Sequence, residues 1–334
     1  MNQGNGPNID FKSIEDLKIK PNLSIGKLLF LAALAAALTT LPIINLFAAI
    51  PLMMAILLYG RKKGYAVSLL YIALLLGLVG VLEASIGVFN IFVSVLITEI
   101  ILRSVHPMRG VIRVSLVLSV IFVSMFAGLC LVEKKGPVEY VNSMVTVSLT
   151  KLKEQNPEQL KQKITSDMTY GEFLKDKESE IKETFIRPIK MPSTIFAGLI
   201  LYIWFSIFLI LRNSMVWRLI VQYPYASRDL LQFRMPDFYI YFVIIGLALT
   251  VAGEYLLGSV GELIGLNIVI TLGVFYFFQG LGIFLEFLNK LRVFGFLRLV
   301  IVSMTVFTAH FLIAAIGVFD YWLNFRSRMK QNNN

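Results

Sequence analysis

The sequence is dominated by long apolar blocks, most of them close to the length of a membrane-crossing helix. A helix needs about 20 apolar residues to cross a hydrocarbon core of about 30 Å. Mean hydropathy is +0.75, and 16% of the residues are charged, against about 25% in average soluble domains. We therefore expect an all-α, polytopic transmembrane helical bundle, which excludes a soluble enzyme. The blocks lie at 27–41, 45–60, 64–83, 85–102, 111–132, 192–211, 237–254, 265–288 and 297–319.

Basic residues between the blocks predict the orientation of the chain. The alternate connections 41–45, 83–85 and 254–264 contain no Lys or Arg, whereas the other connections do. Cytoplasmic loops are rich in Lys and Arg, so the N-terminus is predicted to be cytoplasmic. Nine full crossings would put the basic tail outside. The count of eight or nine spans and the side of the C-terminus therefore stay open.

The second block contains Pro51, and proline removes a backbone hydrogen-bond donor. We therefore expect a kinked or partly re-entrant helix there. The whole chain divides into a cytoplasmic N-terminal segment (1–26), an N-terminal helical bundle (27–132), an extracytoplasmic helical insertion (133–191), a C-terminal helical bundle (192–325) and a polar tail (326–334).

The insertion at 133–191 is the one sizeable segment between apolar blocks. Capping patterns at Asn156–Gln159 and Thr169–Glu172 predict the starts of two helices, the second ending near Pro188. Such a helical hairpin could be a lid or a docking site for a partner. It could equally be a connector lying on the membrane.

Motifs for catalysis and metal binding do not occur in the sequence. It contains no H-E-x-x-H, no Walker A loop, no G-x-S-x-G and no cysteine cluster. The single cysteine, Cys130, lies in an apolar block and is expected to pack there. We therefore expect no catalytic residue, metal or cofactor, and no enzymatic activity of its own. A nucleic-acid partner is not expected either, because the basic residues mark membrane topology.

Four polar residues within the blocks are candidates for lining a ligand cavity, because polar groups in a span normally face the bundle or a cavity. Each could instead serve as a hydrogen bond between helices. The four candidates are Asn90, Asn267, Gln279 and His310.

Two further patterns suggest contacts with partners. Small residues spaced four apart let helices approach closely, and the first block contains two such pairs, Ala32/Ala36 and Ala33/Ala37. Packing within the same bundle would use them equally well. Arginines also alternate with Trp217, Tyr223, Tyr225 and Phe233, which is typical of an interfacial segment contacting anionic lipid or an acidic partner, or simply anchoring the topology. These arginines are Arg212, Arg218, Arg228 and Arg234.

Short motifs across nearly the whole chain carry a resemblance to a known family. They are Phe233-Arg234-Met235-Pro236, Asn267 with Tyr276-Phe277-Phe278-Gln279-Gly280, and Gly317-Val318-Phe319-Asp320-Tyr321-Trp322 with Phe325-Arg326. In these the chain resembles the YybS-like family of bacterial multi-pass membrane proteins of unknown function. The resemblance implies a bacterial cytoplasmic (inner) membrane location.

The N-terminal half is also similar to the substrate-binding S subunits of energy-coupling-factor transporters. In those subunits a small-residue first helix docks a T subunit, and Ala32, Ala33, Ala36 and Ala37 match that feature. S subunits usually have six spans and no insertion of the kind at 133–190, which puts transport in doubt.

Together these features lead to two hypotheses. The first is a non-ATPase integral membrane subunit that binds, and in one version transports, a small molecule or lipid. The alternative is a structural or assembly subunit of a membrane protein complex without a small-molecule ligand. Both place the chain in the lipid bilayer, with membrane protein partners or further copies of itself.

Overall fold

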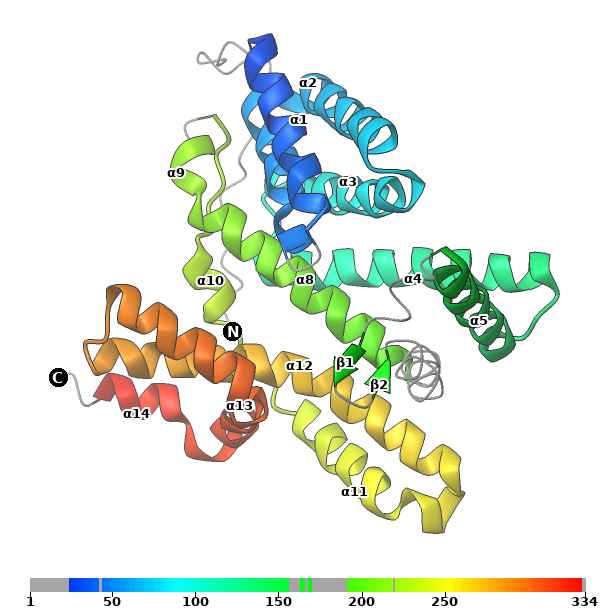
Figure 1. The fold of residues 1–334 in the computed structure, drawn as a ribbon. Helices are drawn as coiled ribbons and strands as arrows, with labels where there is room; N and C mark the ends of the chain where they lie inside the picture. Colours follow the sequence, from blue (N-terminus) through cyan, green and yellow to red (C-terminus); the bar gives the residue numbers. More distant parts are fainter. Residues whose placement is uncertain are drawn as a thin grey trace. The chain divides into compact units, whose positions relative to one another are not determined.

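The computed structural model describes residues 24–41, 44–155, 163–165, 168–169, 191–218 and 220–331, and these are almost entirely helical (Figure 1). Six of its helices are long and apolar enough to cross a membrane, in agreement with a helical membrane bundle. They are α3 (Val81–Leu102, apolar from Glu83), α4 (Pro107–Glu133), α8 (Pro192–Arg212), α11 (Tyr239–Leu257), α12 (Ser259–Lys290, apolar from Val260) and α13 (Gly295–Leu323).

The chain forms two compact units that interleave along the sequence. The first consists of 1–114 and 201–232, and the second of 115–200 and 233–334. The helices α4 and α8 therefore each contribute to both units. The boundaries expected at 132 and 192 divide the chain in sequence order, whereas these units share the helices α4 and α8.

The first unit is built on α1 (Ile25–Thr39), η2 (Ile44–Phe47), α2 (Ala49–Leu78) and α3. Its core joins alanines of α1 to larger side chains of α2, including Leu52, Tyr71 and Leu75. Two short helices, α9 (Ser214–Trp217) and α10 (Ser227–Leu231), follow α8 in the same unit.

The helix break in α2 lies at Gly60, and the expected kink at Pro51 is wrong. Pro51 stands in the first turn, where a missing N–H leaves no intrahelical bond unmade. Gly60 has φ 82° and ψ 168°, a conformation that side chains with a Cβ rarely adopt. Beyond the break the chain comes close to itself, because a Cβ at Gly64 would lie 2.7 Å from the Cα of Ile56.

Glycines let the helices of the second unit approach closely. A Cβ at Gly253 would lie 2.6 Å from the carbonyl carbon of Gly261, where α11 and α12 meet. A Cβ at Gly280 would lie 2.9 Å from the backbone nitrogen of Gly317 and closer still to the carbonyl oxygen of Ile313, where α12 meets α13. Backbone-to-backbone contact of this kind gives membrane helices the van der Waals packing that replaces the hydrophobic effect.

The expected helical hairpin at 133–191 differs in part from the structure. A helix that the capping patterns did not predict, α5 (Pro137–Gln155), ends before position 156, and its Tyr140 ring meets Phe126 of α4 edge-on with 5.9 Å between ring centroids. The first expected helix, from 156, is wrong at 163–165, because β1 (Lys163–Thr165) pairs antiparallel with β2 (Met168–Thr169). The second, from 170 to 188, lies outside the described residues.

We predict that Gly280→Ala destabilises the second unit by about 1–3 kcal/mol, because the new methyl group overlaps the backbone of α13. The measurement is thermal unfolding of the purified protein in detergent. Gly273→Ala is the matched control in the same helix, since its Cβ would meet nothing within 4 Å. Equal unfolding temperatures for the two variants would contradict the close contact of α12 with α13.

Candidate functional site

A buried polar network surrounds Asn90 in the first unit. The Tyr202 hydroxyl donates to Asn90 Oδ1 at 2.8 Å, and Asn90 Nδ2 donates to Asn45 Oδ1 at 2.9 Å. The same amide lies 3.5 Å from the Tyr71 hydroxyl, which is 2.7 Å from Thr39 Oγ1. Asn90 is 2% exposed, and its amide belongs to a hydrogen-bond network that joins α1, α2, α3 and α8 to the turn η2. The sequence alone indicated Asn90, whereas the tyrosines that complete the network gave no signal.

Gln279 is the meeting point of three chain segments in the second unit. The Met235 backbone N–H donates to Gln279 Oε1 at 2.9 Å, and Gln279 Nε2 donates to Asp320 Oδ2 at 3.0 Å. Arg326, in α14 (Phe325–Gln331), donates to the carbonyl oxygens of Gln279 at 3.2 Å and Phe233 at 3.1 Å. Gln279 thus fixes the chain before α11 against the end of α13.

The hydrogen bond from Arg326 to the Phe233 carbonyl brings α14 beside the chain that leads into α11. The helix α13 begins next to the end of α12, where Arg298 donates to Asn289 Oδ1 at 2.6 Å. Its backbone breaks at Ala309 (φ −133°, ψ 32°), and by Asp320 it has reached the level of Gln279 and Met235. The two parts of α13 are therefore separate helical segments on either side of Ala309.

The other two cavity candidates have separate surroundings. Asn267 Oδ1 accepts from the backbone N–H of Ser193 at 3.1 Å, and its Nδ2 donates to the Leu263 carbonyl at 2.8 Å, so the side chain connects α8 to α12. His310 is exposed beside the break in α13, and its ring lies 4.1 Å from that of Phe311. Asn267, Gln279 and His310 therefore share no hydrogen-bond partner.

The alanines of α1 divide into two faces. Ala32 and Ala36 are 0% and 8% exposed and belong to the core of the first unit. Ala33 and Ala37 are exposed, one turn apart. Of the four alanines expected to dock a partner, Ala33 and Ala37 are therefore the two that are accessible on α1.

The arginine segment has exposed charges on a buried aromatic framework. Arg212, Arg218, Arg228 and Arg234 are all exposed, as expected of residues that reach toward phosphates. Trp217 and Tyr223 are 0% and 6% exposed, so these two aromatic side chains pack within the first unit. Trp217 Nε1 donates to the Ile210 carbonyl at 3.0 Å, and the Tyr223 hydroxyl donates to the Val105 carbonyl at 2.8 Å.

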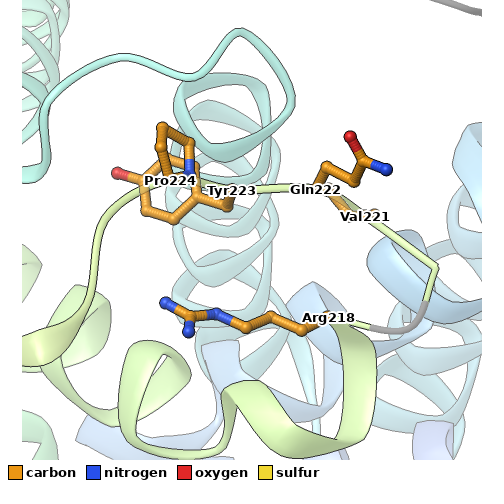
Figure 2. A pocket seen from close by; sticks show the side chains of 5 residues that line it. All are labelled: Arg218, Val221, Gln222, Tyr223 and Pro224. Carbon is orange, nitrogen blue, oxygen red and sulfur yellow. The ribbon is translucent and has the colours of Figure 1, made fainter.

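The same segment contains a cavity of 310 Å³, lined by Arg218, Val221, Gln222, Tyr223 and Pro224 (Figure 2). Figure 2 shows the Arg218 side chain extending along one wall with its guanidinium toward Tyr223 and Pro224, while Gln222 extends away. The arginine was a sequence candidate. Tyr223 was part of the pattern of alternating arginines and aromatic residues, whereas Val221, Gln222 and Pro224 belong to no motif in the sequence.

Burial sets the protonation of the groups around this loop. Burial lowers the pKa of His106, Arg109 lowers it further, and Asp229 partly opposes them. Neutral imidazole suits the structure, because His106 Nδ1 accepts from the Met108 backbone N–H at 3.3 Å at the start of α4. Burial likewise raises the pKa of the Tyr223 hydroxyl, which remains a donor at neutral pH.

Comparison with known proteins places the chain by family alone. A family model described as "Predicted membrane protein (DUF2232)" matches residues 27–321. No curated protein and no solved structure shows a significant match.

We predict that Arg234→Cys and Ser327→Cys, each in a Cys130→Ala background, react with a membrane-impermeant maleimide from the same side. Arg326 binds the Phe233 carbonyl, so both sites lie at the same end of the second unit. Tyr255→Cys, 91% exposed near the far end of α11, is the control and reacts from the opposite side. Reaction of residues 234 and 327 from opposite sides would show that α13 crosses completely.

Proposed function

We propose that this chain, which belongs to the family of predicted membrane proteins DUF2232, is a non-ATPase integral membrane subunit that binds a small molecule or lipid. The proposal includes no catalytic step of its own. It places the chain in the bacterial inner membrane with a cytoplasmic N-terminus. In this proposal α1 and the two parts of α2 add spans to the six long apolar helices, giving eight or nine with a partly re-entrant segment.

The observation that carries the proposal is the cavity beside Arg218. Its volume of 310 Å³ lies at the lower end of the range of small-molecule sites, about 300–1,000 Å³. Its walls combine apolar side chains with one cation, the pattern by which such sites orient a ligand.

The polar residues within the spans have a structural role in the proposal. Asn90, Asn267 and Gln279 are engaged in hydrogen bonds between helices, and this is their alternative role from the sequence. We therefore propose that they stabilise their own units, Asn90 the first and Asn267 and Gln279 the second, and that the ligand site lies in the loop after α8.

The resemblances to the YybS-like family and to S subunits lead to two further proposals. A YybS-like membership would leave the activity open, whereas a likeness of the N-terminal half to S subunits would make α1 the docking helix for a T-like subunit. Ala33 and Ala37 are the residues of α1 that could carry such a contact, because Ala32 and Ala36 are buried.

The test of ligand binding is native mass spectrometry of the protein purified from its host in mild detergent. We expect a bound small molecule or lipid in the wild-type protein and its loss in Pro224→Trp, because an indole at this exposed wall, opposite Arg218, fills the mouth of the cavity. Pro224→Ala, which leaves the space open, is the matched control. Wild-type protein without a bound molecule, or Pro224→Trp with undiminished occupancy, would refute the proposal.

The second candidate is an assembly subunit, and the exposed pair on α1 favours it. Small exposed residues one turn apart allow a partner helix to approach closely. We expect Ala33→Leu with Ala37→Leu to abolish co-purification of a membrane partner without changing thermal unfolding. Ala32→Leu differs, because it overfills a fully buried position and is expected to destabilise the first unit by about 1–3 kcal/mol.

If the double variant retains all the partners of the wild-type protein, α1 is not the docking helix. If the wild-type protein purifies without any partner, the assembly function itself is refuted.

A further inference from the structure

We propose that the cavity beside Arg218 binds the phosphate group of an anionic phospholipid. This inference rests on the proposed function and names the class of its ligand. Arg218 supplies the charge, and the apolar walls contact the glycerol and the first acyl carbons.

The position of the cavity in the chain points to a lipid. The loop connects α8, which ends at Arg212, with α11, which begins at Tyr239, and both helices are long and apolar enough to cross a membrane. A short connection between two spans lies at the membrane surface, where phospholipid phosphates are concentrated. Its arginines predict the cytoplasmic side, whose anionic lipids attract basic segments.

The Arg218 guanidinium is held in place with most of its donors available. It donates from Nη2 to the Tyr225 carbonyl, which fixes its direction along the cavity wall. A guanidinium has five N–H donors, and their fork matches phosphate oxygens. Within the described part of the chain, no carboxylate forms an ion pair with Arg218.

Two carboxylates of the first unit, those of Asp229 and Glu99, bind other donors. Asp229 Oδ2 accepts from the Ala226 backbone N–H at 2.6 Å at the start of α10. Glu99 binds Arg61 at 2.7 Å and Arg103 at 3.2 Å. These carboxylates are therefore held by other donors, which leaves Arg218 to an external anion.

The walls of the cavity are rigid before any ligand arrives. Tyr223 is 6% exposed and bonded to the Val105 carbonyl, and Pro224 next to it has a fixed φ. Trp217, which precedes Arg218, is fully buried and bonded to the Ile210 carbonyl. A preformed site loses little conformational entropy on binding, so one charge-assisted contact can produce selectivity.

The experiment is a titration of the delipidated full chain in detergent with phosphatidylglycerol or phosphatidylcholine, read by native mass spectrometry. We expect preferential binding of phosphatidylglycerol, and an affinity about tenfold lower in Arg218→Gln, because a hydrogen bond to a charged group is lost. Arg218→Lys should lie between them, since lysine keeps the charge without the fork. Arg212→Gln is the matched control, because Arg212 is exposed in the same unit outside the cavity, and we expect a change of about twofold or less.

Each contrary result has a distinct meaning. Equal losses in Arg218→Gln and Arg212→Gln would overturn the site in favour of diffuse attraction to the basic surface. Equal binding of both lipids to the wild-type protein would overturn the selectivity for an anionic lipid while leaving the proposed ligand binding intact. Displacement of phosphatidylglycerol by inorganic phosphate alone would overturn the lipid as the ligand. Binding of neither lipid would overturn this inference, whereas a different molecule retained from the host would still support the proposed function.

Discussion

The hydrocarbon core offers no hydrogen-bond partners, so every polar group placed there has to find its partner within the protein. Both units are organised around this constraint. In the first, the Asn90 amide joins Asn45 and Tyr202, which lie far apart in sequence. In the second, Gln279 receives the Met235 backbone N–H and bonds Asp320. Side chains that could have bound a ligand therefore determine which helices meet.

Close packing of backbones complements these hydrogen bonds. Leucine-rich surfaces gain little from meeting each other in lipid, so helix association depends on contact area at short distance. Gly253 with Gly261 and Gly280 with Gly317 provide it in the second unit. Because Asp320 follows Gly317 by one turn, the second contact also determines where its carboxylate meets Gln279.

The cavity beside Arg218 depends on the same framework at the membrane surface. Trp217 donates to the Ile210 carbonyl in α8 and Tyr223 to the Val105 carbonyl in the turn between α3 and α4, and between these two bonds the loop has little freedom. A sequence of alternating arginine and aromatic residues is usually interpreted as an interfacial anchor. Here the aromatic side chains face inward and support a wall, while the arginines remain outside, so the same pattern yields a candidate binding site.

The sequence by itself determined the class of the protein, because the length and hydropathy of its blocks leave only a helical membrane bundle. It also indicated Asn90, Gln279 and Arg218, since polar residues in or beside spans are costly unless they are used. Tertiary structure decided their partners: Tyr202 for Asn90, Met235 and Asp320 for Gln279, and the cavity walls for Arg218. The hydrogen-bond partners of Asn90 and Gln279 are distant in sequence, and hydropathy reports burial without identifying the neighbour. The walls beside Arg218 are close to it in the chain, but their placement depends on the bonds of Trp217 and Tyr223 to the rest of the first unit.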